Sequence, residues 1–160
     1  MTNRFFLLGA LGAALSLPLA ASELSCPDLA ALVQVNGCPT EEELQYTYVG
    51  YCSDNATVYG NKADPCVDYA DYRKLKNLAR WESADGEFTG YLSCDLPEAE
   101  WRTQKPTCIA VAMQGQITRV ICRYPQGINL THRTRASCVV ADDAKAACAD
   151  DAAACRARCD

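Results

Sequence analysis

The sequence predicts one disulfide-stabilised α+β domain, with three or more helices packed against an antiparallel sheet of about four strands. The first observation behind this is the content of 11 cysteines in 160 residues, which is typical of a disulfide framework in an exported chain. The second is a set of helix-start signals, and the third is a set of β-branched and aromatic segments near glycines. Helix and strand signals alternate irregularly, an order that places helices on one face of a sheet.

Residues 1–22 have the pattern of a secretory signal peptide. Arg4 is followed by the apolar run FFLLGALGAALSLPLA, and small residues near Ala21 and Ser22 suit cleavage. The alternative, a retained N-terminal anchor, agrees less well with those small residues and with the shortness of the run. We expect a secreted, extracellular domain over residues 23–160, with no membrane span.

Two helices and a strand are expected in the N-terminal third. Ser25 is a possible N-cap, and the first helix would end at Asn36-Gly37. Thr40 and Glu43 have the spacing of a capping box and start a second helix. The aromatic and β-branched segment YTYVGYCS, residues 46–53, then predicts a strand.

The clearest helix signal covers residues 63–80. Asp64 is its expected N-cap and Pro65 occupies the first helical position, where no donor is lost. Residues 86–94 predict a strand, and residues 100–104 are a second strand candidate.

A β-hairpin is expected from residues 108–113 and 117–124 around Gly115. With a two-residue turn, Cys108 and Cys122 point to opposite faces of the hairpin and cannot bond. A three-residue loop would place them opposite each other, but the two-residue turn is the more common geometry.

The C-terminal part predicts a loop over residues 125–135 and an alanine-rich helix over residues 141–159. Cys148, Cys155 and Cys159 would share one stripe of that helix. Cys148 and Cys155 would then lie roughly 10 Å apart, too far for a disulfide.

Eleven cysteines leave one without an intramolecular partner. Cys159, next to the frayed end of the chain, is the expected unpaired residue, so the protein would be a monomer or a cysteine-linked dimer. The cysteines expected in disulfides are Cys26, Cys38, Cys52, Cys66, Cys94, Cys108, Cys122, Cys138, Cys148 and Cys155.

Two N-glycosylation sequons, at Asn55 and Asn129, fall in segments expected to be exposed. Together with the signal peptide and the cysteines, they predict a glycoprotein if the source is eukaryotic.

The net charge of −5 argues against a nucleic-acid partner. Two basic clusters are nevertheless present, and the favoured interpretation is a solvated surface with ion pairs rather than an anion or polysaccharide site. The first contains Arg73, Lys74, Lys76 and Arg80, and the second contains Arg119, Arg123, Arg133 and Arg135 around His132.

No catalytic or metal-binding pattern is found. His132 is the only histidine, which excludes zinc sites built on paired histidines, and neither G-x-S-x-G nor C-x-x-C occurs. Acid pairs such as Glu98 and Glu100 give a weak signal for a glycosidase. We therefore expect no enzyme activity, cofactor or metal. Trp81 and Trp101, like several tyrosines, are expected to pack in the core rather than form a contact surface.

The signal sequence, the cysteines from Cys26 to Cys159 and the two sequons resemble the small secreted cysteine-rich proteins of filamentous fungi, many of which are apoplastic effectors on host plants. The pair Trp101-Arg102 is similar to one in the LARS effectors, whose fold is an antiparallel sheet backed by helices. The resemblance implies a non-catalytic virulence protein that binds an extracellular host protein or wall component.

Two alternatives remain open. One is an inhibitor of extracellular hydrolases, which an exposed loop from Asn129 to Ala136 would favour. The other is a small secreted hydrolase using carboxylates, which two facing carboxyl groups, one of them with a raised pKa, would favour.

Overall fold

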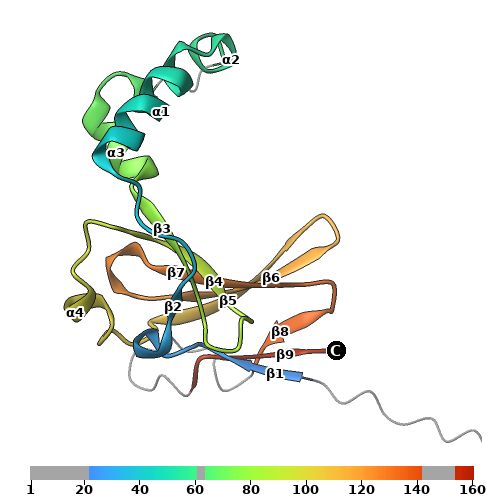
Figure 1. Ribbon diagram of the computed structural model, residues 1–160. Helices are drawn as coiled ribbons and strands as arrows, with labels where there is room; N and C mark the ends of the chain where they lie inside the picture. The colour runs from blue at the N-terminus through green and yellow to red at the C-terminus, as the bar shows by residue number, and fades with distance from the viewer. Residues whose placement is uncertain (1–21, 61–63, 142–153) are drawn as a thin grey trace, which may run out of the picture.

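The structure, a computed structural model, describes residues 22–60, 64–141 and 154–160. Two antiparallel sheets form the framework of this part of the chain, a three-stranded sheet of order β1-β9-β8 and a six-stranded sheet of order β2-β3-β4-β7-β6-β5 (Figure 1). The strands are β1 (Ser22–Ser25), β2 (Val33–Gln34), β3 (Leu78–Glu82), β4 (Thr89–Ser93), β5 (Cys108–Gln114), β6 (Ile117–Arg123), β7 (Asn129–Thr134), β8 (Cys138–Val140) and β9 (Arg156–Cys159).

The α+β prediction is wrong, because the described chain is mostly β and its α-helices are short. The longest has 13 residues. The helices are α1 (Glu41–Ser53), α2 (Asn55–Val58), α3 (Tyr69–Lys76) and α4 (Glu98–Trp101), with 3₁₀ turns η1 (Leu29–Ala31), η2 (Asp64–Cys66) and η3 (Pro125–Gly127).

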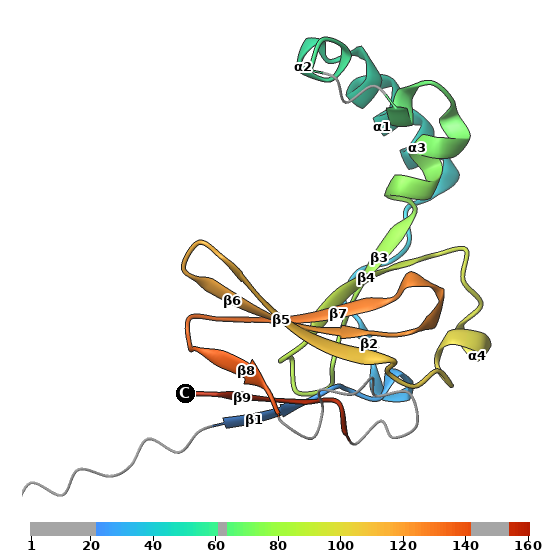
Figure 2. The same ribbon diagram turned by 180° about the vertical axis from the view of Figure 1, so that it is seen from behind.

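The helices α1, α2 and α3 do not cover a sheet. They form a projection, here called the arm (residues 39–77), which rises from the end of the six-stranded sheet (Figures 1 and 2). We call the two sheets and the segments packed on them the body. Helical signals were present in the sequence, but they belong to the arm rather than to a layer on the sheet.

Within the arm, the capping box is confirmed. The Thr40 hydroxyl accepts a hydrogen bond from the Glu43 N–H, and the Glu43 carboxylate accepts one from the Thr40 N–H at 2.7 Å. The helix that starts there continues through residues 46–53, so the strand predicted for them is wrong. Tyr48 packs edge-on against Tyr69, with ring centroids 5.3 Å apart. This packing overrides the strand propensity of aromatic residues, which depends strongly on context.

The predicted helix at residues 63–80 is shorter than expected. Asp68 caps α3 by accepting a hydrogen bond from the Ala70 N–H, while Asp64 and Pro65 belong to η2. The helix ends at Lys76 with Asn77 as its C-cap, and β3 begins at the next residue, Leu78.

Four other segments also differ from the prediction. Residues 25–36 form the last residue of β1, then η1 with Asp28 as its N-cap, and then β2, while residues 100–104 fall at and beyond the end of α4. The predicted loop at 125–135 contains β7, and the predicted C-terminal helix ends in β9. Burial alternates along β9, and Ala157 and Cys159 are buried. Successive side chains of a strand point to opposite faces of the sheet, so every second residue faces the interior.

The hairpin prediction is confirmed. In the β5–β6 pair, Gln114 lies opposite Ile117, which leaves a two-residue turn at Gly115 and Gln116. Gly115 has φ of 61°, a conformation that suits glycine in such a turn. The predicted strand at 86–94 is also present, as β4.

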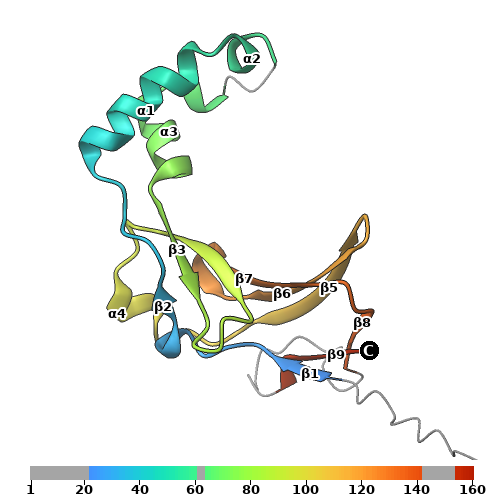
Figure 3. The same ribbon diagram turned by 45° about the vertical axis from the view of Figure 1, so that its right-hand side comes forward.

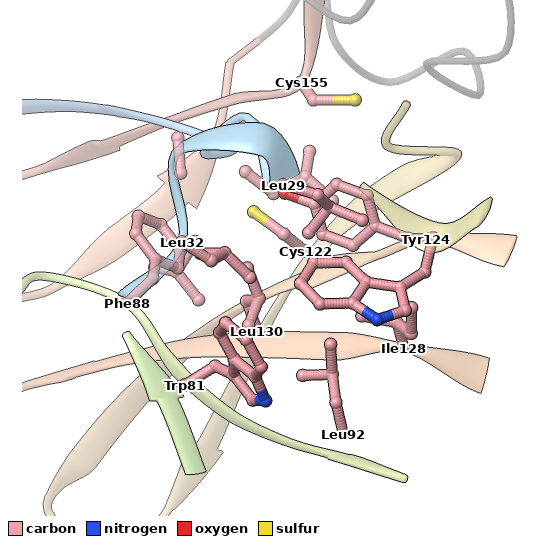
Figure 4. Packing of buried hydrophobic residues seen from close by; sticks show 14 of the residues in the cluster. Leu29, Leu32, Trp81, Phe88, Leu92, Cys122, Tyr124, Ile128, Leu130 and Cys155 are labelled. Atoms are coloured by element: carbon pink, nitrogen blue, oxygen red, sulfur yellow. The ribbon is translucent and has the colours of Figure 1, made fainter. Parts of the chain in front are cut away.

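The hydrophobic core lies between the six-stranded sheet and the N-terminal segment that contains η1 (Figure 4). Leu29 contributes from η1, Leu130 from β7 and Cys122 from β6, and all three are fully buried. Trp81 and Trp101 are 5% and 1% exposed, with ring centroids 5.0 Å apart, which confirms their predicted place in the core.

The disulfides among described residues join Cys26 to Cys122, Cys38 to Cys94, Cys52 to Cys66 and Cys138 to Cys159. Cys155 is also disulfide-bonded.

Two of the cysteine predictions are therefore wrong. Cys159 is not unpaired, because β9 lies beside β8 and places it opposite Cys138. Among the cysteines that the structure describes, Cys108 is the free thiol. Cys148 lies outside the described residues. Residues 1–21 of the predicted signal peptide also lie outside them. Ser22, the last residue of that prediction, belongs to β1 and pairs with Cys159.

Candidate anion-binding face

One face of the six-stranded sheet packs on the core, and the other, here called the open face, points away from it. Register decides which residues lie there, because successive side chains on a strand alternate between the two faces. Arg123 is on the face opposite to the buried Cys122, and Tyr91 is on the face opposite to the buried Leu92. Figure 3 shows the sheet between the arm at one end and the rising β5–β6 hairpin at the other. The open face carries Arg80 and Glu82 of β3, Thr89 and Tyr91 of β4, Asn129, Thr131 and Arg133 of β7, Arg119, Ile121 and Arg123 of β6, and Cys108 and Ala110 of β5.

Three arginines gather on this face. Arg119 and Arg133 are directly opposite each other across β6 and β7, and Arg123 is four residues along β6 from Arg119. None of the three forms an ion pair with a residue that the structure describes. Like charges directly opposite across strands are destabilising. This arrangement therefore lowers stability unless an anion binds there.

The hydrogen bonds of Arg119 are also incomplete. One of its terminal nitrogens donates to the Gln114 side chain at 3.3 Å. Its Nε is buried and has no hydrogen-bond partner. An unsatisfied buried donor carries a desolvation penalty of about 1–3 kcal/mol.

A groove of about 590 Å³ lies over these strands. Its chemistry combines guanidinium groups, hydroxyl groups and a side-chain amide around the partly buried Ile121. The residues that give it this character are Thr107, Arg119, Ile121, Arg123, Asn129 and Thr131. The Asn129 side chain donates to the Gly127 carbonyl at 2.9 Å, which fixes it at the rim of the groove.

The first basic cluster of the sequence is different, because its charges are used within the molecule. Arg73 binds Asp95 through both terminal nitrogens, at 2.8 and 3.0 Å, and Lys74 pairs with Asp71. Lys76 lies 4.9 Å from the centre of the Tyr51 ring. Arg80 forms an ion pair with Glu82 on the open face. The expectation of ion pairing thus holds for this cluster but not for the second one.

The structure separates His132 from the arginines beside it in sequence. Its ring lies on the core side of β7, 5.7 Å from the Phe88 ring, and its Nδ1 is 3.0 Å from the Glu87 carboxylate. His132 is part of strand β7 and takes no part in the open face.

The carboxyl groups with resolved shifts have lowered pKa values. The Arg73 guanidinium lowers the pKa of Asp95, and the Ser83 hydroxyl lowers the pKa of Asp85. The Tyr69 hydroxyl lowers the pKa of Glu41, and the Thr40 N–H lowers that of Glu43. A general acid needs the opposite shift. Of the acid pair noted in the sequence, Glu98 binds Arg102 at 2.9 Å.

Tyr91 is the residue of this face that the sequence reasoning missed. It is 63% exposed and lies on β4, on the same face as Thr89, which pairs with Thr131. The signal was available, because the predicted strand at 86–94 alternates the buried Phe88 and Leu92 with outward positions. An aromatic residue at an outward position of a strand indicates a contact surface.

Both sequon asparagines are exposed. Asn55 starts α2 on the arm, and Asn129 starts β7 on the open face.

Among the described residues, no helix has the length and apolar character to cross a membrane, and no three side chains of His, Cys, Asp or Glu gather as metal ligands. Comparison of the chain with protein-family models, with curated proteins and with solved structures finds no match in any of the three.

Proposed function

We propose that the chain is a secreted, non-catalytic binding protein that captures an anionic ligand on the open face of its six-stranded sheet. The observation that carries this proposal is the group of Arg119, Arg123 and Arg133, which lie together without an ion-pair partner in the described part of the chain.

The chemistry of arginine supports an anionic ligand. The guanidinium group is planar and binds carboxylate or sulfate oxygens with two parallel hydrogen bonds. An anion between Arg119 and Arg133 would remove the repulsion between their guanidinium groups. A free energy that is unfavourable in the unbound protein would thus become part of the binding energy.

An extracellular site of action agrees with the disulfides, which persist in oxidising compartments. We further propose that the ligand belongs to the extracellular space of a host, as the likeness to apoplastic effectors implies. The inhibitor alternative loses its main support, because Asn129 and the residues after it form β7, a strand inside the sheet, rather than an exposed loop.

The proposal is tested by titrating the purified protein with dextran sulfate and with a polyuronate at about 50 mM and 200 mM salt. The triple variant Arg119→Gln/Arg123→Gln/Arg133→Gln should bind at least about tenfold more weakly, a loss of roughly 1.4 kcal/mol. A matched control is Lys74→Gln/Lys105→Gln/Arg158→Gln, which removes the same charge from exposed positions elsewhere. The control should keep its affinity within about threefold, since rim and distant charges act weakly.

Two results would contradict the proposal. Either the unaltered protein binds neither polymer at the lower salt concentration, or both triple variants lose the same affinity. The second result would mean that net charge rather than the open face controls binding.

A further inference from the structure

We infer that the ligand of the open face is an acidic polysaccharide, a chain of uronate sugars that stacks on Tyr91 and pairs its carboxylates with the three arginines. This inference rests on the proposed function and adds the chemical class of the ligand.

The first support is the position of Tyr91. Antiparallel pairing of Thr89 with Thr131 places Tyr91 across from Asn129, and Asn129 in turn lies opposite Arg123. A Cβ atom at Gly90 would collide with the Asn129 carbonyl oxygen, so β4 and β7 approach closely here. An exposed ring, an amide and a guanidinium group therefore follow one another across three strands. The strands are about 4.8 Å apart, a step comparable to the length of one sugar unit in a polysaccharide chain.

The second support is the mixture of groups between the charges. Arg123 and the Arg119–Arg133 pair are about 13 Å apart along β6, because a strand rises about 3.3 Å per residue. Ile121 and Thr131 lie opposite each other in the interval. Sugar rings have apolar faces and hydroxyl edges, so a floor of this composition suits them. The carboxylates of a uronate chain then reach the two charged ends.

Three other anionic ligands fit less well. A single phosphate or sulfate is small for an open groove of about 590 Å³. An extended acidic peptide would bind by adding a strand to a sheet edge, but β6 and β7 are interior strands whose backbone groups are already paired. A nucleic acid requires a broadly basic surface, and the chain carries a net charge of −5.

The test compares four probes on the full protein, namely a uronate oligosaccharide, its methyl ester, polyglutamate and polyphosphate. The uronate should bind most tightly. Its ester should bind at least about tenfold more weakly, because esterification removes the charge while it keeps the sugar rings.

Variants of Tyr91 isolate the contribution of stacking. Tyr91→Ala should weaken uronate binding by about fivefold or more, and Tyr91→Phe should retain it, because the ring face rather than the hydroxyl makes the contact. The matched control is Tyr59→Ala on the arm, a tyrosine 84% exposed, which should bind as the unaltered protein does.

The outcomes separate this inference from the proposed function. If polyglutamate or polyphosphate binds as tightly as the uronate, or if Tyr91→Ala binds uronate normally, the polysaccharide is excluded while the anion-binding face remains. If none of these charged probes binds and dextran sulfate does not bind either, the inference and the proposed function both fail.

Discussion

The arm and the open face each carry a cluster of basic residues, and they differ in what those residues contact. On the arm, Arg73 is held between Glu41 and Asp95, and Lys74 pairs with Asp71. On the open face, Arg119 and Arg133 lie beside each other, and neither forms an ion pair with an acidic residue that the structure describes. The same residue types at similar sequence density thus have different roles. Charges that stabilise the fold have partners within the molecule, and charges that are available to a ligand do not.

The interiors of the two regions also differ. The arm packs tyrosine rings against one another, and the Tyr48 and Tyr69 hydroxyls are hydrogen-bonded. The Tyr69 hydroxyl donates to Glu41 at 2.6 Å, and burial together with this hydrogen bond raises the pKa of Tyr69 to about 12. The body packs Trp81, Trp101 and aliphatic residues from several strands. We therefore expect the arm to open at lower free energy than the body.

Removal of disulfides is the largest test of this difference in stability between the arm and the body. The Cys26–Cys122 bond spans 96 residues and ties the segment between β1 and η1 to strand β6 of the body, whereas Cys52–Cys66 spans 14 within the arm. Replacement of the first pair by serine should lower the free energy of unfolding by about 4–5 kcal/mol, and replacement of the second by about 3 kcal/mol.

Tryptophan fluorescence measures the first effect, because Trp81 and Trp101 both lie in the body. Limited proteolysis of residues 39–77 measures the second. If the Cys52→Ser/Cys66→Ser variant lowers the fluorescence melting temperature as much as Cys26→Ser/Cys122→Ser does, the arm and the body unfold as one unit.

The sequence predicts a segment correctly when the interactions that form it join residues close to one another in the chain. The capping box at Thr40 and the β5–β6 hairpin depend on residues close in sequence, and both were predicted correctly. Strand β9 depends on β1 and β8, which lie far away in the chain. Its local composition is alanine-rich and favours a helix, so only long-range pairing could reveal it.

The candidate site was predicted in part. The arginine cluster was visible in the sequence, but not its lack of partners, because the acidic residues that neutralise the first cluster come from distant segments such as the one containing Asp95. The prediction also placed His132 with the arginines. Its side chain has the opposite parity on β7 and therefore lies on the other face.

Glycosylation should affect the arm and the open face differently, because one sequon lies in each region. A glycan on Asn129 would occupy the open face beside the groove and should weaken anion binding at least about tenfold, whereas a glycan on Asn55 lies on the arm and should leave binding unchanged. Protein from a eukaryotic secretor should be separated by mass into glycoforms and titrated with polyuronate. The variants Asn129→Gln and Asn55→Gln supply the matched pair. Equal affinity of the two singly modified forms would place the ligand elsewhere.

The N-cap of α1 should contribute a smaller, local effect. Thr40→Ala removes the hydroxyl that accepts a hydrogen bond from the Glu43 N–H, while the backbone N–H of residue 40 can still donate to the Glu43 carboxylate, and should destabilise the arm by about 1 kcal/mol. Amide hydrogen exchange along α1 should increase while exchange in the body stays constant. Ser53→Ala, at the opposite end of α1, is the control. Faster exchange in the body as well would show that the arm supports it.

The smallest expected effect is the pH dependence of the attachment of the arm. Arg73 lowers the pKa of Asp95 in the folded protein, so this pair contributes stability above the pKa of the unfolded carboxyl, near 3.9, and loses it as the pH falls through the lower folded value. Because the pair is partly exposed, the effect is modest. Protection factors of the arm amides, which compare the observed exchange rate with the intrinsic rate at the same pH, should fall as the pH is lowered from about 5 to about 2. Asp95→Asn should make that fall smaller, and the remainder belongs to Glu41 and Glu43, whose pKa values are also lowered. A fall of the same size in the variant would assign it to those carboxyls alone.

Successive side chains of the β5–β6 hairpin alternate between the two faces of the sheet, and this has a chemical consequence for the lifetime of the protein. Cys108 keeps a free thiol on the open face, while Cys122, opposite its neighbour Ile109, is bonded to Cys26 on the core side. Exchange between a thiol and a disulfide requires direct attack of one sulfur on another. The folded sheet separates these sulfurs and so prevents exchange of the native disulfide. When the sheet unfolds, the Cys108 thiolate can attack the disulfides. Heating at alkaline pH should therefore make unfolding irreversible, and Cys108→Ser should restore reversibility.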